Sequence, residues 1–282
     1  MKGIDNTFND RRRGEALLVV SPDGQCFATT SNGCDIALWD TETGTHIMAL
    51  EHIGVIYSLE FLPNGQLVSG NENGKMSLWD IATGTRVHEL QVHSNCIRSL
   101  SASKSKLASG SEDKTVRVWD TTSWECISTF ECNYEVMSVA LYPNSDRVAA
   151  WTKLSFSNAG RLHVWDTETR QLMKSWDPSY CNGVAVSNDS KWLALASDKT
   201  ISLYDASTLD CIWSHGRRSD SISFSPDSCQ LVAANLINNK VELIDIQTRD
   251  LVRSLKHKGV ERAIFSHDGS RVISGESCSV TL

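Results

Sequence analysis

Long hydrophobic runs are missing from this sequence of 282 residues. No stretch approaches the roughly 20 consecutive apolar residues that a membrane-spanning helix needs, so we expect no membrane association. The opening residues, MKGIDNTFNDRRRGE, are polar and lack the apolar centre of a secretion signal. This pattern predicts a protein of the cytoplasm or nucleus.

Paired cysteines and common catalytic motifs are also missing. The nine cysteines are odd in number and include no Cys-x-x-Cys pair, which favours free thiols over a disulfide framework. The sequence has no G-x-x-x-x-G-K phosphate loop, no H-E-x-x-H zinc motif and no G-x-S-x-G nucleophile elbow. We therefore expect a protein that is not an enzyme and that holds no metal or other cofactor.

An excess of basic residues is a third missing feature. The formal net charge is −7 at pH 7. Proteins that bind nucleic acids usually have a surface patch rich in Lys and Arg, so we expect no general nucleic-acid binding here. The hydrophobic content of 40% is ordinary for a soluble globular chain.

The sequence does contain an internal repeat. Six similar segments, such as IALWDTETGT and MSLWDIATGT, each end an alternating apolar stretch with an Asp. The residues before that Asp are Trp39, Trp79, Trp119, Trp165, Tyr204 and Ile244, at spacings of 40, 40, 46, 39 and 40 residues. Turn segments such as SPDG and LPNG precede them in phase, so each unit predicts four short strands and no helix.

This pattern resembles the WD40-repeat family over almost the whole chain. The resemblance rests on the Trp-Asp endings, the histidines before the first strands and the turns that recur in phase. It implies an all-β fold, a WD40-type β-propeller whose blades are four-stranded antiparallel sheets around a narrow channel. It also implies a non-catalytic scaffold or adaptor that binds other proteins or peptides.

Counting the repeats predicts seven blades, with the seventh incomplete at the C-terminus. The first six are expected near residues 14–50, 51–90, 91–130, 131–176, 177–214 and 215–255. Leu282 aligns with Leu38 and Leu78, so the seventh blade stops before the end of its third strand. We expect an N-terminal segment, 1–13, ahead of a propeller domain, 14–282, with residues 3–9 pairing with the seventh blade. Alternatively, the chain is a fragment of a longer protein.

The resemblance implies a buried hydrogen-bonded set in blade three. Its members are His93, Ser109, Asp113 and Trp119. The carboxylate can accept from the imidazole, and the hydroxyl can bridge the imidazole to the indole N–H. Blade two carries His52, Ser69 and Trp79, with Asn73 in place of the Asp. We disfavour a hydrolytic triad, because a triad needs an exposed nucleophile and an oxyanion site.

The resemblance also implies that partners dock on the face that carries the loops entering each first strand. The side chains expected there are Tyr57, Glu72, Arg98, Glu112, Met137, Tyr180, Asn182, Arg218, Asp220 and Glu261. Interface energy concentrates in aromatic and arginine anchors, which favours Tyr57, Arg98, Tyr180 and Arg218. For any one of them the alternative is an ordinary solvated rim residue.

Blade four is longer than its neighbours, and its extra length includes Trp151 and Phe156. These aromatics either fill a longer hairpin or form a partner-binding protrusion. Two other functions also stay open. One is a sensor or regulatory propeller within a larger signalling protein, such as an ATPase or kinase. The other is a propeller enzyme with carboxylates, histidines or metal ligands converging on the channel.

Overall fold

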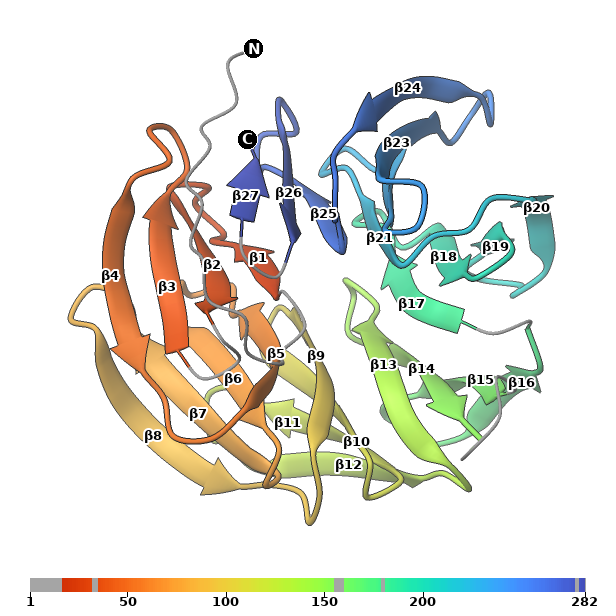
Figure 1. Cartoon of the computed structure of the whole chain (residues 1–282). Helices are drawn as coiled ribbons and strands as arrows, with labels where there is room; N and C mark the ends of the chain where they lie inside the picture. Colours follow the sequence, from red (N-terminus) through yellow and green to blue (C-terminus); the bar gives the residue numbers. More distant parts are fainter. Residues whose placement is uncertain (1–16, 32–34, 155–159, 179–180, 277–278, 282) are drawn as a thin grey trace.

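The computed structural model describes residues 17–31, 35–154, 160–178, 181–276 and 279–281. These residues form strands and turns without a helix, so no described helix is long and apolar enough to cross a membrane. Seven antiparallel sheets are arranged in a ring around a common axis (Figure 1). The prediction of an all-β propeller with an incomplete seventh blade is confirmed.

Each blade is a sheet whose strands follow one another in sequence order. Blade one contains β1 (Leu18–Val20), β2 (Cys26–Ser31), β3 (Asp35–Asp40) and β4 (His46–Glu51). Blade two contains β5 (Ile56–Phe61), β6 (Leu67–Asn71), β7 (Lys75–Asp80) and β8 (Thr85–Gln91). Blade three contains β9 (Ile97–Ser103), β10 (Lys106–Ser111), β11 (Thr115–Asp120) and β12 (Cys126–Glu131). Blade four contains β13 (Glu135–Leu141), β14 (Arg147–Lys153), β15 (Gly160–Asp166) and β16 (Leu172–Trp176).

The remaining blades continue the same order. Blade five contains β17 (Cys181–Val186), β18 (Trp192–Ser197), β19 (Ile201–Asp205) and β20 (Cys211–His215). Blade six contains β21 (Ser221–Phe224), β22 (Gln230–Asn235), β23 (Lys240–Asp245) and β24 (Leu251–Lys256). Blade seven has three described strands, β25 (Arg262–Phe265), β26 (Val272–Glu276) and β27 (Ser279–Thr281).

The loops of the ring divide between two faces, because each blade is an antiparallel meander. The turns between first and second strands, and between third and fourth strands, lie on one face, which we call the turn face. The loops between second and third strands, and those between blades, lie on the opposite face, which we call the channel-mouth face. Any site is therefore assigned to a face by the loops that form it.

The Asp of each Trp-Asp ending builds the turn that follows it. In blade three, Asp120 Oδ1 accepts hydrogen bonds from Thr122 N (2.8 Å) and Ser123 N (2.9 Å). Both bonds hold the pKa of Asp120 below its ordinary value, and the bond from Ser123 N has the larger effect. The strand register shifts between Val118 and Trp119, and the equivalent step shifts in the other five complete blades. A bulge at this position aims the tryptophan while the carboxylate closes the turn.

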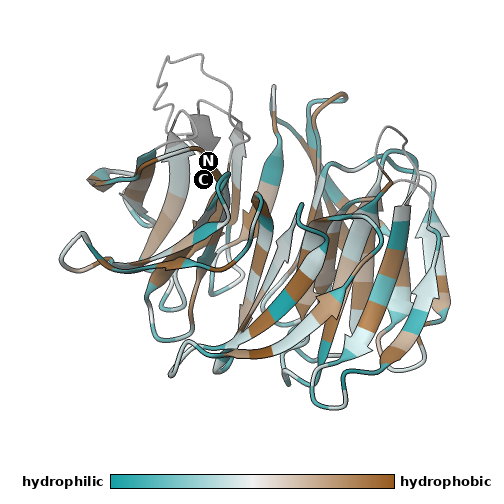
Figure 2. Cartoon of the chain, turned by 90° about the horizontal axis from the view of Figure 1, so that it is seen from below, coloured by the Kyte–Doolittle hydropathy of each residue, from teal (hydrophilic) through white to brown (hydrophobic). Residues whose placement is uncertain are grey.

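The apolar core lies in the seams between blades. Hydrophobic and hydrophilic residues alternate along the strands (Figure 2), and each seam has its own buried cluster drawn from two neighbouring blades. Close approach requires glycine in two seams. A Cβ added to Gly70 would lie 2.7 Å from the Cγ2 atom of Ile97, and one added to Gly110 would lie 2.6 Å from a Cγ1 atom of Val136. These glycines let the next blade pack tightly.

In the seam between blades four and five, a large side chain stands at the glycine position and a small one stands at the valine position. Trp151 occupies the position in β14 that Gly110 occupies in β10, and Cys181 occupies the position that Val136 has in β13. Trp151 is 1% exposed and belongs to the same buried cluster as Cys181. A large side chain opposite a small one fills the same space as glycine opposite valine. Trp151 is thus a core residue of a strand and not part of a protrusion.

First strands form the inner edges of the sheets, and side chains from the preceding blade satisfy some of their free N–H groups. Ser101 Oγ accepts from Leu141 N at 3.0 Å between blades three and four. One seam earlier, Glu60 Oε1 accepts from Ala102 N at 3.2 Å. Glu60 occupies the position in blade two that Ser101 occupies in blade three. A carboxyl group therefore accepts the backbone hydrogen bond in one seam, and a hydroxyl group accepts it in the next. Burial raises the pKa of Glu60 to about 8.

Blades seven and one close the ring through a small core and a long side chain. Leu18, Phe27 and Ile273 are buried together in this seam. Arg271 Nη1 donates to the carbonyl oxygen of Thr41 at 3.2 Å. The predicted pairing of residues 3–9 with blade seven, and the predicted segment 1–13, lie outside the described residues.

The closing contact repeats one found inside the ring. Arg147, the first residue of β14, donates through Nη1 to the carbonyl oxygen of Ala206 in blade five at 2.9 Å. Arg271 precedes β26 in the corresponding place, and Thr41 holds the place of Ala206. The seam between the last and first blades therefore uses the same contact as the seam between blades four and five.

Glu60→Gln tests the buried carboxyl group through pH. An unfolded glutamate titrates near pH 4.3. Between about pH 4.5 and 8 the unfolded chain therefore releases a proton that the folded chain keeps, and the free energy of unfolding falls as pH rises. Glutamine keeps an acceptor for Ala102 N without this penalty. We expect the substitution to raise the free energy of unfolding, measured with urea, more at pH 8 than at pH 4.5. The difference between the two pH values should exceed about 1 kcal/mol.

Glu89→Gln is the control for this measurement. Glu89 lies on the outer strand β8, and a hydrogen bond from Lys75 lowers its pKa. Its removal should not stabilise the chain at pH 8. An effect of Glu60→Gln that is the same at both pH values would contradict the buried, protonated carboxyl group.

Candidate partner-binding site

A cavity of about 530 Å³ opens on the channel-mouth face, and five blades contribute to its wall. Its volume falls in the range of about 300–1,000 Å³ that is typical of ligand pockets. Five residues expected from the sequence line it: Arg98, Met137, Asn182, Asp220 and Glu261. The structure thus brings together, at the end of the channel, side chains that lie far apart in the chain.

Arg98 is held in one orientation by two neighbours that were also expected at this face. Its guanidinium carbon lies 4.4 Å above the centre of the Tyr57 ring. Its Nε donates to Glu112 Oε1 at 2.7 Å. Cation–π stacking and a charge-assisted hydrogen bond together fix a planar guanidinium at the rim of the cavity.

The blade-six side of the cavity is organised by one carboxylate. Asp220 Oδ1 accepts from Arg218 Nη2 at 2.8 Å, and Asp220 Oδ2 accepts from Leu236 N at 2.9 Å. The neighbouring Asn182 Nδ2 donates to the carbonyl oxygen of Ser219 at 2.8 Å. The carboxylate therefore ties the loop before β21 to the loop after β22.

Among the described residues, the other side chains expected at this face do not line the cavity. Glu72 Oε1 accepts from Val55 N at 3.2 Å and ties together two loops of blade two. Tyr180 and Phe156 lie outside the described residues. Sequence reasoning did not place Trp151 in the cavity wall, nor Lys153, Cys181, Leu236 and Arg262.

The cavity has an apolar floor. Trp151 and Cys181 are buried, and Met137 packs against them. Burial raises the pKa of the Cys181 thiol to about 12, so it is an uncharged part of this floor. Leu236 stands at the rim and is 39% exposed. The site therefore offers an apolar surface bordered by fixed charges.

Blade three contains a continuous buried hydrogen-bond set. His93 Nδ1–H donates to Asp113 Oδ2 (2.9 Å), and Ser109 Oγ lies 2.7 Å from His93 Nε2. Trp119 Nε1–H donates to the same hydroxyl oxygen at 2.9 Å. Because Asp113 accepts from Nδ1–H, a neutral imidazole presents Nε2 as an acceptor for the serine hydroxyl. The set then runs from the indole to the carboxylate with every group paired.

The environment of this set is structural. Burial alone would raise the pKa of Asp113, but hydrogen bonds from His93 and Thr115 hold it well below its usual range. Ser109 is completely buried, so its hydroxyl is closed to a substrate. Within the described ranges, no three His, Cys, Asp or Glu side chains gather into a group that could hold a metal ion.

A family model described as "WD domain, G-beta repeat" matches residues 44–80, 84–120 and 171–205. These three segments are WD40 repeats. Each matched WD40 segment spans the fourth strand of one blade and the first three strands of the next. No curated protein matches the chain in a sequence comparison. WD40 propellers typically bind other proteins, and the family is generally non-catalytic.

The WD40 hydrogen-bond set of blade two differs from the one expected. Trp79 Nε1–H donates to Ser69 Oγ at 3.0 Å. His52 does not reach this hydroxyl: its Nδ1–H donates to the carbonyl oxygen of Gly54 at 3.3 Å, and its Nε2 has no partner among the described residues. Asn73 replaces the carboxylate that orients the histidine in blade three. Only the tryptophan–serine half of the set remains.

Two equivalent hydrogen bonds in other blades were missed by sequence reasoning. Trp39 Nε1–H donates to Thr29 Oγ1 at 2.9 Å in blade one. In blade seven, His257 Nδ1 lies 2.7 Å from Ser274 Oγ. A signal for the first was present, because the hydroxyl residue precedes the tryptophan by ten positions in blades one, two and three alike.

Alanine substitutions compare the complete WD40 set with the partial one. Ser109→Ala leaves two buried nitrogens without partners, those of His93 and Trp119, whereas Ser69→Ala leaves only that of Trp79. A buried polar group left unpaired costs about 1–3 kcal/mol. We expect Ser109→Ala to lower the free energy of unfolding by about 2–4 kcal/mol, and Ser69→Ala by about half as much, in urea titrations. Equal losses would show that the histidine adds nothing to the set.

Proposed function

We propose that this protein is a non-catalytic scaffold or adaptor that binds partner proteins or peptides on its channel-mouth face. The observation that carries the proposal is the cavity of about 530 Å³, in which an apolar floor is bordered by side chains already held in place. This combination is the usual composition of a recognition site. The WD40 fold supports the proposal, because propellers of this family typically bind proteins.

The fixed orientation of the rim favours binding. Arg98 is stacked on Tyr57 and bonded to Glu112 by contacts within the chain itself. A side chain that is already ordered loses little further conformational freedom on association. Arginine and tyrosine are also the residue types that most often dominate interface energies.

Exposed apolar side chains at the rim supply the hydrophobic part of the interface. Leu236 and Ile237 are adjacent in the loop between β22 and β23 and are 39% and 65% exposed. Burial of apolar surface contributes about 25 cal/mol per Å² removed from water. A partner that fills the cavity would cover Leu236, so this residue should contribute strongly to binding.

A matched pair of leucine variants tests this function. Leu236→Asp places a charge at the cavity rim, whereas Leu251→Asp makes the same change on the outer strand β24 of the same blade, where the leucine has a similar exposure of 40%. Captured proteins would be compared by quantitative mass spectrometry among the wild type and both variants. We expect Leu236→Asp to lose specific partners by at least about ten-fold, because a central interface residue contributes this much.

The control variant defines what would contradict the function. Leu251→Asp should retain the partners of the wild-type protein, since its side chain lies far from the channel-mouth loops. If Leu236→Asp retains all partners, or if both variants lose the same ones, the channel-mouth face is not the docking site.

A further inference from the structure

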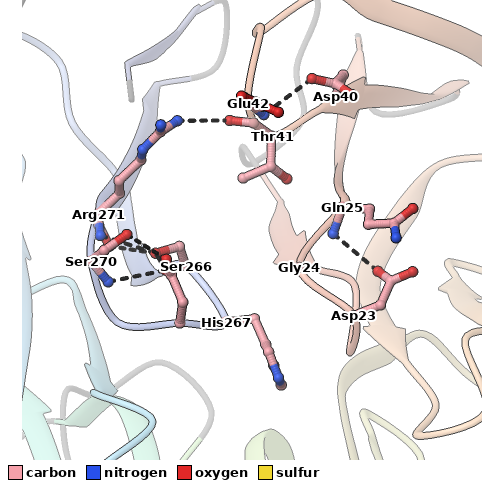
Figure 3. Close-up of a pocket in the computed structure, with 11 residues that line it drawn as sticks. Asp23, Gly24, Gln25, Asp40, Thr41, Glu42, Ser266, His267, Ser270 and Arg271 are labelled. Atoms are coloured by element: carbon pink, nitrogen blue, oxygen red, sulfur yellow. Dashed lines mark hydrogen bonds between the residues drawn. The ribbon is translucent and has the colours of Figure 1, made fainter.

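We propose that a second pocket, on the turn face at the seam between blades seven and one, binds the ammonium group of a lysine side chain from a partner protein. The pocket has a volume of about 520 Å³. Blade one contributes the turns at residues 23–25 and 40–42, and blade seven contributes the turn at residues 266–271 (Figure 3). It lies on the face opposite the channel mouth, so it is independent of the function proposed above.

The pocket wall carries an excess of negative charge. Its carboxylates are those of Asp23, Asp40, Glu42 and Asp268, against the single guanidinium of Arg271. Hydrogen bonds within the turns hold the pKa of three of these carboxyl groups low: from Ser21 to Asp23, from Thr43 to Asp40 and from Ser266 to Asp268. These groups therefore stay ionised at neutral pH and favour a cation.

A buried hydroxyl group without a partner points to where that cation binds. Thr41 is 7% exposed, and its Oγ1 has no hydrogen-bond partner among the described residues. Figure 3 shows the Thr41 side chain directed into the space between the two blades. Leaving a buried hydroxyl unpaired is unfavourable, so a donor reaching it would be stabilising.

Another seam of the same ring shows which chemical group fits this position. Between blades three and four, Lys106 Nζ donates to the carbonyl oxygen of Ser145 at 3.1 Å and to Thr167 Oγ1 at 3.4 Å. Thr167 Oγ1 in turn donates to the same carbonyl at 2.8 Å. Thus an ammonium group completes the hydrogen bonding of a threonine in the corresponding turn.

The seam between blades seven and one has the same frame without that ammonium group. Thr41 holds the place of Thr167, and Gly24 holds the place of Ser145, with a positive φ at both turn residues (71° and 64°). Arg271 holds the place of Lys106, but it donates to the Thr41 carbonyl oxygen and not to the hydroxyl. An ammonium group from outside can therefore donate to Thr41 Oγ1 within an acidic pocket, as Lys106 does for Thr167.

Peptide binding tests this inference. The probe is a fluorescent peptide with blocked termini, Gly-Ser-Gly-Lys-Gly-Ser-Gly, titrated by fluorescence anisotropy against the full chain. The comparison peptide carries Nε-acetyl-lysine, which removes the charge and keeps most of the shape. We expect saturable binding of the lysine peptide and binding of the acetylated peptide that is at least about ten-fold weaker. Equal affinities, or no saturation up to about 1 mM, would overturn the proposal.

A matched pair of aspartate variants places the binding at this pocket. Asp40→Asn removes one charge but keeps the Oδ1 acceptor that builds its turn. Asp80→Asn makes the same change in the equivalent turn of blade two, where Asp80 Oδ1 accepts from Ala82 N and Thr83 N. Asp40→Asn should weaken binding of the lysine peptide by about three- to five-fold, and Asp80→Asn by less than about two-fold.

Thr41→Val tests the hydroxyl group separately. Valine keeps the shape of the side chain in the seam, so the chain should fold, which thermal unfolding would verify. The variant should weaken lysine binding as Asp40→Asn does. If Asp40→Asn and Asp80→Asn behave alike, or if Thr41→Val binds as well as the wild type, the pocket is not the lysine site. Neither result would bear on the channel-mouth variants, which lie on the other face.

Discussion

Packing between neighbouring blades is the interaction on which the whole structure depends. The buried clusters lie in the seams, so each sheet is stable only with a sheet on either side. Different pairs of residues fill the equivalent space in two of the seams. Gly110 faces Val136 in one, whereas Trp151 faces Cys181 in the next. The reversal between blades four and five also supplies the apolar floor of the channel-mouth cavity. The packing of Trp151 against Cys181 therefore contributes both to the ring and to the candidate site.

The seam between blades seven and one joins the two ends of the described chain by the same rules. Its core of Leu18, Phe27 and Ile273 is small, and Arg271 adds a hydrogen bond to the Thr41 carbonyl oxygen. The same bond, made by Arg147 within the ring, shows that the arrangement is regular. Because the seam unites the first repeat with the last, it creates a pocket that neither repeat contains alone.

Much of this was predictable from the sequence, because similar repeats encode each blade locally. The recurring Trp-Asp endings and turns predict four short strands in each unit, and the spacing predicts seven blades. The complete set around His93 was predictable for the same reason. The missing hydrogen bond between His52 and Ser69 was not predictable, because it depends on the three-dimensional effect of having Asn73 in place of an aspartate. The partners across seams, such as Trp151 and Cys181, were hidden because they belong to different repeats.

Native-state hydrogen exchange measures ring closure most directly. In a closed ring the first strands of all blades are inner strands flanked on both sides. Amides of β1 and β25 should then be protected to an extent comparable with those of β9, because local opening would require separation of a packed seam. If β1 and β25 exchange fast while β9 stays protected, blades seven and one do not pack together. That result would contradict the closed ring and remove the pocket between them.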